Sequence, residues 1–182
     1  MIHDIERILV SAEEIDEISS RIAEQINRDY KDSGKKLVLI CILKGSLMFT
    51  CELMKRITLP VEIEFMKVSS YGAGTESSGM INIHLDLKRD DLSNADFIIV
   101  EDIIDSGRTL SHLVRYLADR GACSVKTCTM LDKPSRRTVD YTPDYCGREI
   151  PDFFVVGFGL DYDEKYRNLP FVGILKPEVY SK

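Results

Sequence analysis

The stretch VEDIIDSGRTL, residues 100–110, places three carboxylates beside a Ser-Gly-Arg-Thr run. The run follows a strongly apolar segment, and residues 106–109 are expected where a helix begins. Unpaired backbone N–H groups at a helix start, together with hydroxyl donors, form a pocket for a phosphate. Glu101 and Asp102 precede this pocket and can accept hydrogen bonds from sugar hydroxyls, which carry a proton to donate, whereas an ionised phosphate has none to give a carboxylate. The segment therefore predicts a site for a ribose 5-phosphate group.

Simpler interpretations of the same residues exist. Asp105 or Ser106 can cap a helix, and Glu101 and Asp102 can be solvated charges at the end of a strand. Two other phosphate-binding patterns are not met, because the sequence has no GxxxxGK[ST] and its GAGTES stretch does not complete GxGxxG before a helix.

The surrounding sequence indicates a parallel sheet that would position this segment. Continuous apolar runs are typical of strands covered on both faces. They lie at residues 37–42, 96–100, 124–131, 153–158 and 171–175. Helices are expected over residues 11–34, where Ser11 and Glu14 fit a capping box, over residues 46–57, and from the phosphate segment to about Arg120. Strands that alternate with helices predict a mostly parallel α/β sheet with functional groups at the carboxyl ends of the strands.

A different pattern occupies the middle of the chain. Residues 61–70 and 81–87 alternate apolar and polar side chains, as half-exposed strands do. The glycine-rich stretch YGAGTESSG joins them. An antiparallel pair with a long connecting loop is expected, and loops of this length are often functional lids.

Composition narrows the classes of function. The chain has 182 residues, of which 44% are hydrophobic, which suits one folded domain. A net charge of −6 argues against binding of nucleic acid through bulk positive charge. The five cysteines form no CxxC pair, which disfavours a metal or redox centre. No apolar run approaches the ~20 residues of a membrane span, and the first residues lack a signal-peptide core, so a cytoplasmic setting without membrane contact is expected.

The phosphate segment resembles the diphosphosugar-binding signature of the type I phosphoribosyltransferases. LKGS, SSYG, LDKPSRR and PDFFVVGFGLDYDEKYRNLP extend the likeness in the family's order. Together these motifs resemble the 6-oxopurine branch, the hypoxanthine-guanine enzymes, over roughly residues 37–175. The resemblance implies the α/β fold of the family: a mostly parallel twisted sheet flanked by helices, with a small hood and a flexible antiparallel loop. A single domain, residues 1–182, is expected, with a core at about 37–150 and a hood from the N-terminal segment and residues 151–182.

The activity that the resemblance implies is purine salvage. Such enzymes transfer the 5-phosphoribosyl group from 5-phospho-α-D-ribose 1-diphosphate to N9 of hypoxanthine or guanine, with Mg²⁺, giving IMP or GMP and diphosphate. A homodimer or homotetramer is expected, and no nucleic acid partner.

The resemblance also implies roles on the sugar and diphosphate side. Glu101 and Asp102 would bind the ribose hydroxyls and contribute to the metal site. The 5′-phosphate would be held by Asp105, Ser106, Gly107, Arg108 and Thr109. Asp105 would also lie near purine N7 as the general acid or base, where a carboxylate can stabilise developing positive charge on the sugar.

The diphosphate would be bound by Lys44, Gly45 and Arg167, whose fork of donors suits a polyanion. In the family the peptide before the lysine is often cis. Ser70 and Tyr71 match the lid pair that would close over the reacting centre and exclude water.

On the purine side, Lys133 would donate to the 6-oxo group, so adenine, which presents a donor there, should be a poor substrate. Phe154 would stack on the base, and the backbone of Val155 would meet the purine edge. Asp161 would read the 2-position with its backbone and reach Mg²⁺ through water. Asp163 and Glu164 are expected to be surface charges.

Two alternatives remain open. A regulator on the same fold could bind RNA through a local basic face around Lys133, Arg136 and Arg137. A transferase could also prefer another base, such as xanthine or a pyrimidine.

Overall fold

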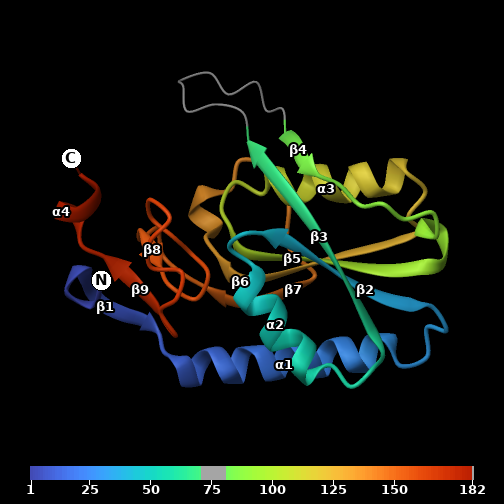
Figure 1. Ribbon diagram of the computed structural model, residues 1–182, viewed down its shortest axis with the longest axis horizontal. Helices are drawn as coiled ribbons and strands as arrows, with labels where there is room; N and C mark the ends of the chain where they lie inside the picture. Colours follow the sequence, from blue (N-terminus) through green and yellow to red (C-terminus); the bar gives the residue numbers. More distant parts are fainter. Residues whose placement is uncertain (71–80, 182) are drawn as a thin grey trace.

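A computed structural model describes residues 1–70 and 81–181, and of Ser70 only the backbone; within this part the chain forms two sheets (Figure 1). The larger has six strands in the order β4-β3-β2-β5-β6-β7. Its strands are β2 (Lys36–Leu43), β3 (Val61–Ser70), β4 (Ile81–Leu85), β5 (Ala95–Ile104), β6 (Ser124–Asp132) and β7 (Tyr145–Glu149). All neighbours pair in parallel except β3 and β4. The predicted mostly parallel α/β fold is confirmed.

Helices cover both faces of this sheet, and the alternation of side chains along the strands explains how. Leu37 and Leu39 of β2 pack in one apolar cluster with α1 (Ala12–Tyr30) and α2 (Leu47–Arg56). Val38 and Ile40 point the other way and pack with α3 (Arg108–Asp119). Because both faces of the sheet pack against apolar side chains at β2, this strand has a continuous hydrophobic sequence and no alternation of apolar and polar residues.

The predicted start of α1 is confirmed by its hydrogen bonds. The Ser11 side chain accepts from the Glu14 backbone N–H at 3.2 Å, and the Ser11 N–H donates to the Glu14 carboxylate at 2.8 Å. These two bonds form a capping box, which satisfies two of the donors that a helix start leaves unpaired. The helix ends at Tyr30, before the predicted end at Gly34.

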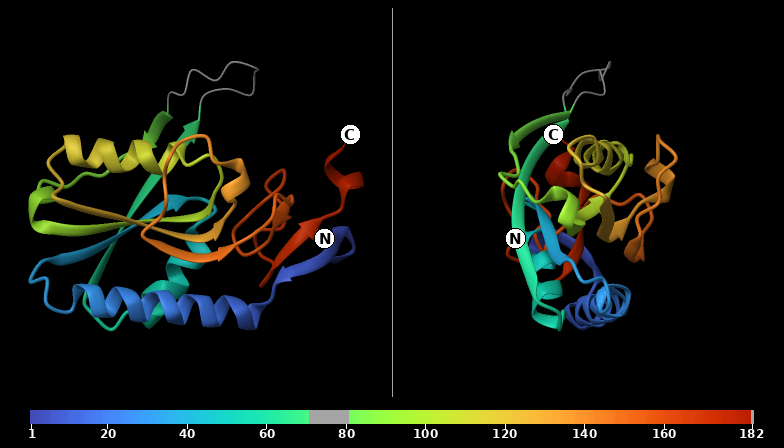
Figure 2. Two further views of the ribbon diagram at one scale, coloured as in Figure 1. Left: turned by 180° about the vertical axis from the view of Figure 1, so that it is seen from behind. Right: turned by 90° about the vertical axis from the view of Figure 1, so that its right-hand side faces the viewer.

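The smaller sheet forms a hood at one end of the molecule. Its strands are β1 (Ile5–Val10), β9 (Val172–Leu175) and β8 (Val155–Val156), paired antiparallel in that order. The short α4 (Pro177–Tyr180) follows β9, and Figures 1 and 2 place both chain termini at this end. The apolar runs at 153–158 and 171–175 therefore do not extend the parallel sheet, because their partners are each other and β1.

The edge strands differ from the sequence expectation in two ways. β7 has the sequence YCGRE and lacks an apolar run, so its side-chain pattern did not reveal it. β4 ends at Leu85, two residues earlier than predicted. Tyr71, the side chain of Ser70 and the rest of the predicted lid lie outside the described residues. Among the described helices, none has the length and hydropathy needed to span a bilayer.

Candidate active site

The carboxyl ends of two central strands bring the predicted groups together. β5 runs on past the apolar residues through Glu101 and Asp102 because it continues to pair with β6, with Ile103 opposite Leu131 and Ile104 opposite Asp132. Residues 105–109, which are predicted to hold the 5′-phosphate and are called the phosphate segment below, follow β5, and Lys133 follows β6. Adjacent parallel strands end at the same edge, so the acids, the phosphate segment and the lysine share one site.

The two acids on β5 lie in an environment that disfavours their charge. Burial, and then the neighbouring Asp102, raise the pKa of Glu101 well above its usual range. Burial also raises the pKa of Asp102, although the N–H of Ile103 donates to its Oδ1 at 2.8 Å. Among the described residues the Glu101 Oε2 atom is buried and has no hydrogen-bond partner. A buried acceptor without a partner in the protein is open to a hydrogen bond from a ligand or an ordered water.

The loop after β2 packs directly on Asp102. A Cβ atom at Gly45 would lie 1.6 Å from the Asp102 Oδ2 atom, so only glycine allows this approach. The peptide bond between Leu43 and Lys44 is cis, which the sequence alone did not decide. The loop predicted for diphosphate therefore lies against the acids predicted for the ribose.

A cavity of about 100 Å³ lies at the start of α3. It is lined by Glu101, Ile103, Ile104, Asp105, Ser106, Gly107, Thr109 and Leu110. Arg108 is the first residue of α3, as expected for a phosphate site at a helix start, and its side chain donates to Thr138 at 3.1 Å. The first-turn N–H groups of a helix have no intrahelical acceptor, so the cavity is suited to an anion.

A segment after β6 holds the phosphate segment from outside. The N–H groups of Thr138 and Val139 donate to the Ser106 carbonyl at 3.1 and 3.3 Å. The Arg137 guanidinium donates to the Asp105 carbonyl and forms an ion pair with the buried Asp132. The open alternative of an RNA-binding regulator included Arg137 in a local basic face, but the side chain is largely buried and bonded inward. Nothing in its type or spacing distinguished it from its exposed neighbour.

A second cavity, of about 160 Å³, lies between β5 and the hood. Its lining comprises Ile103, Asp105, Lys133, Phe154, Val155, Leu160 and Asp161. Every residue predicted for the purine is present, and the sequence reasoning missed the two aliphatic ones. Ile103 lies within the VEDIIDSGRTL stretch, and its apolar side chain was the only sign that it could contact a flat base.

Charged groups converge on this second cavity. The Lys133 Nζ atom is buried 3.9 Å from the Asp105 Oδ1 atom and 3.7 Å from the Asp152 Oδ1 atom. Among the described residues, Asp105 Oδ1 is a buried acceptor without a hydrogen bond. The cavity therefore offers an ammonium donor and a carboxylate acceptor to one flat ligand.

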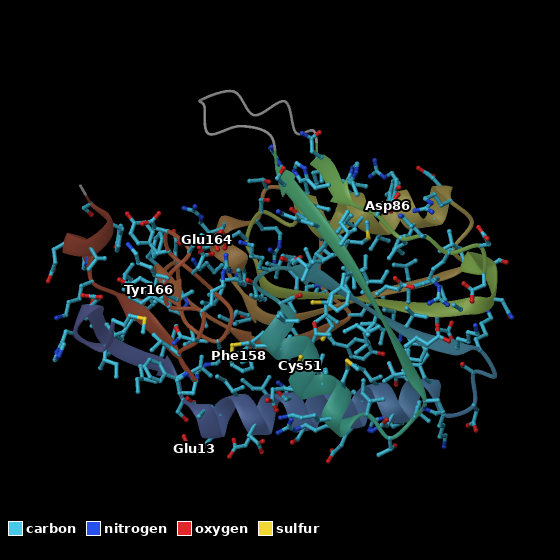
Figure 3. All side chains as sticks on the ribbon, in the orientation of Figure 1. Glu13, Cys51, Asp86, Phe158, Glu164 and Tyr166 are labelled. Carbon is cyan, nitrogen blue, oxygen red and sulfur yellow. The ribbon has the colours of Figure 1, made fainter. Side chains whose placement is uncertain are left out.

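The hood supplies charges opposite the loop after β2. The Lys44 Nζ atom lies 2.9 Å from the Glu164 carboxylate, which also meets Arg167 at 3.4 Å. Arg167 pairs with Asp161 at 2.8 Å. The hydrogen bond and charge of Lys44, and then Arg167, lower the pKa of Glu164. Figure 3 shows Glu164 on the side of the hood turned toward the central sheet. Glu164 is exposed as predicted, but it bridges both cations predicted to bind diphosphate.

The described residues contain no cluster of three or more His, Cys, Asp or Glu side chains that could hold a metal by themselves. Glu101, Asp102 and Asp161 are nevertheless hard oxygen donors at the site. Magnesium commonly binds through one or two carboxylates, with substrate phosphates and water completing its shell. The donor set fits that mode of binding.

Known proteins resemble this chain over nearly its whole length. A family model described as "Phosphoribosyl transferase domain" matches residues 10–163. The hypoxanthine-guanine phosphoribosyltransferase of Lactococcus lactis is 52% identical, over 98% of this chain and 95% of its own. That of Staphylococcus aureus is 48% identical, over 100% and 99%. A crystal structure of a hypoxanthine phosphoribosyltransferase from Staphylococcus aureus superimposes with a TM-score of 0.94, at 47% identity, covering 100% of this chain and 97% of that one.

Proposed function

The chain belongs to the phosphoribosyltransferase family, in its hypoxanthine-guanine branch, and from that premise we propose how its residues divide the reaction. It is a purine salvage enzyme that transfers the 5-phosphoribosyl group from 5-phosphoribosyl 1-diphosphate to N9 of hypoxanthine or guanine. The observation that carries the assignment of residues is the convergence of Lys133 and Asp105 on one cavity beside the phosphate segment.

The purine lies between Ile103 and Phe154. Lys133 donates to O6, and Asp105 accepts the proton of purine N7. Loss of that proton leaves electron density at N9, which forms the bond to C1′ while the bond from C1′ to the diphosphate oxygen breaks. The Oδ1 atom of Asp105 supports this role, because it is a buried acceptor that makes no hydrogen bond, although it lies 3.9 Å from the Lys133 ammonium.

The sugar lies over the end of β5. Glu101 and Asp102 accept from the ribose hydroxyls, and residues 105–109 hold the 5′-phosphate. Glu101 and Asp102, with Asp161, would also hold Mg²⁺ when it is bound. The metal, when bound, neutralises charge on the diphosphate oxygens. The Glu101 Oε2 atom supports this assignment, because it is buried and receives no hydrogen bond within the protein.

The diphosphate is bound by Lys44, Gly45 and Arg167, which requires the Glu164 carboxylate to give up Lys44 and Arg167. Ser70 and Tyr71 close over the site as a lid and exclude water, which would otherwise compete with the purine for C1′.

The setting is proposed on separate grounds. All five cysteines are free thiols, as suits a reducing cytoplasm. The chain acts as one domain, residues 1–182, in a homodimer or homotetramer. Exposed Leu47, Phe65 and Leu85 offer apolar surface that such a contact would cover. An RNA-binding role is not favoured, because Arg137 is turned inward and does not contribute to a basic face.

Product analysis tests the function. The protein is mixed with 5-phosphoribosyl 1-diphosphate, Mg²⁺ and, separately, hypoxanthine, guanine, xanthine, adenine or uracil. We expect IMP and GMP, little AMP, and a rate lowered roughly 100-fold or more in Asp105→Asn, since proton transfer typically contributes about 10²–10⁴-fold. Asp140→Asn, an exposed aspartate on the neighbouring segment, is the matched control. If no base gave a nucleotide, the assigned function would be refuted. If xanthine were the preferred base, the enzyme would be a xanthine phosphoribosyltransferase instead.

A further inference from the structure

Phe154 lies at the edge of the purine cavity without the support of a long strand. It precedes the two-residue β8, and its side chain is 38% exposed. A phenyl ring that is this open can rotate about two side-chain bonds.

The ring is held by two other aromatic side chains. Tyr180 stacks on it with ring centroids 4.5 Å apart and an angle of 15° between the planes. Tyr162 meets it edge-on, at 5.6 Å and 86°. Both arrangements are favourable for aromatic pairs. Phe154 lines the purine cavity and Tyr180 does not.

Tyr180 is itself fixed by the two ends of the chain. It lies in α4, which follows β9, and the Leu175 N–H donates to the Phe154 carbonyl at 2.9 Å. The Lys176 N–H donates to the Asp4 carbonyl at 2.9 Å. Tyr180 also packs against a small apolar cluster of the hood. The helical turn therefore has a defined place relative to the backbone of Phe154.

We propose that Tyr180 is a positioning residue for base binding: it backs Phe154 so that the opposite ring face is preformed for the purine. This inference rests on the proposed function, in which Phe154 stacks on the base. Fixing a side chain in its bound orientation removes an ordering cost from binding. Loss of Tyr180 should therefore weaken purine binding and leave binding of 5-phosphoribosyl 1-diphosphate unchanged.

Steady-state kinetics of Tyr180→Ala, Tyr180→Leu and Tyr180→Phe test this. We expect the KM for hypoxanthine to rise about five- to tenfold in Tyr180→Ala, as for the loss of one aromatic pair. Tyr180→Leu keeps apolar volume without a flat ring and should show a similar rise with its Tm preserved. Tyr180→Phe should lie within about twofold of the wild type, because stacking does not need the hydroxyl. Glu178→Ala, an exposed residue of the same turn, is the control.

Three results would overturn the proposal. A fall in the KM for hypoxanthine would mean that Tyr180 competes for the stacking face. An unchanged KM in both Tyr180→Ala and Tyr180→Leu would mean that Phe154 needs no backing. Equal losses for both substrates with a lowered Tm would mean a purely structural role. If the wild type forms no nucleotide, the proposed function fails instead, and GMP binding measured by calorimetry on the same variants still tests the backing of Phe154.

Discussion

Glu164 shows how single charged residues of the site are paired before any substrate arrives. Its carboxylate lies 2.9 Å from Lys44 and 3.4 Å from Arg167, the two cations assigned to diphosphate. All three side chains keep contact with solvent, so the pairs are weak and can exchange partners. The same geometry that neutralises these cations in the free protein also makes Glu164 a competitor of the diphosphate group.

The substitution Glu164→Gln removes that competitor. We expect the KM for 5-phosphoribosyl 1-diphosphate and the inhibition constant of diphosphate to fall by about two- to fivefold, in line with the ~0.2–1 kcal/mol of an exposed ion pair. Initial rates at fixed hypoxanthine measure both constants. Asp163→Asn is the matched control, since Asp163 pairs with Lys165 at 3.0 Å. A rise in either constant would instead show that Glu164 holds the cations in their binding positions.

At the scale of elements, the sequence predicted those parts that have a local signature. The buried strands, the capping box of α1 and the helix start at Arg108 follow from apolar runs, hydrogen-bonding side chains and glycine. β7 has no such pattern, because an edge strand with the sequence YCGRE is recruited by pairing with β6 rather than by its own composition. Arg137 and Ile103 were missed for the same reason: their roles come from residues that the fold brings beside them.

Arg137 links two elements of the site, and its loss should affect both. In Arg137→Met the buried Asp132 loses its ion pair, and the phosphate segment loses a donor to the Asp105 carbonyl. We expect a loss of about 3 kcal/mol in stability, since removing one partner of a buried pair strands the other charge. The KM for 5-phosphoribosyl 1-diphosphate should also rise, because the phosphate segment is less well held.

Thermal unfolding and kinetics of two further variants separate these effects. Arg136→Met removes an exposed arginine of the same turn, which pairs with Asp152 at 3.3 Å, and should change neither property much. The double variant Arg137→Met/Asp132→Asn should recover part of the Tm, because the stranded charge is gone, but not the KM. If the double variant recovered both the Tm and the KM for 5-phosphoribosyl 1-diphosphate, the hydrogen bond from Arg137 to the Asp105 carbonyl would contribute little to holding the phosphate segment.

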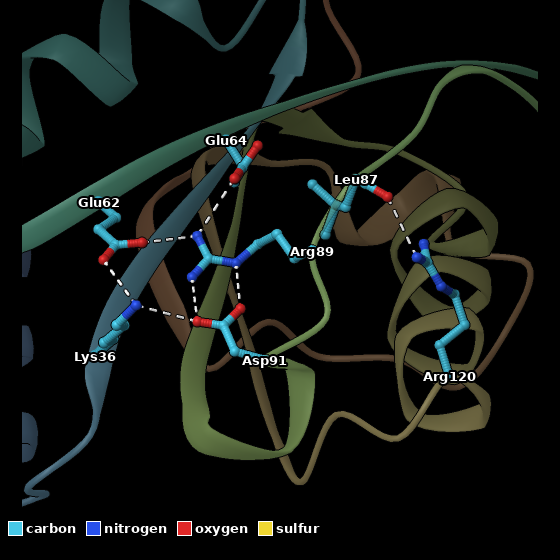
Figure 4. Close-up of polar contacts among 7 residues, drawn as sticks. All are labelled: Lys36, Glu62, Glu64, Leu87, Arg89, Asp91 and Arg120. Carbon is cyan, nitrogen blue, oxygen red and sulfur yellow. Dashed lines mark hydrogen bonds and ion pairs between the residues drawn. The ribbon is translucent and has the colours of Figure 1, made fainter.

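At the scale of the whole molecule, the end of the sheet opposite the site is held by a charge network. Arg89, between β4 and β5, pairs with Asp91 at 2.8 Å and with Glu62 and Glu64 of β3 at 2.8 and 3.3 Å. Lys36, at the start of β2, joins the same group through Asp91 and Glu62 (Figure 4). The network ties the β4–β5 connection to the amino ends of two sheet strands. It is a structural feature, remote from the groups that bind substrate.

This network should make stability depend on acid pH through Asp91. Hydrogen bonds from Arg89, and then from Lys36, lower the pKa of Asp91 from its ordinary 3.8 to about 2. Because the folded-state pKa is the lower one, the unfolded chain binds more protons in this range, and stability falls with falling pH. The contribution is complete above pH 3.8 and is lost as the pH falls through 2.

Asp91→Asn should therefore be less stable than the wild type at pH 7 by an amount that stays constant to about pH 5 and shrinks below pH 4. Urea unfolding at 25 °C and pH 7, 5, 4 and 3 measures the gap, with the exposed Asp90→Asn as control. A gap that is absent at pH 7, or undiminished at pH 3, would mean that Asp91 does not draw its low pKa from this network.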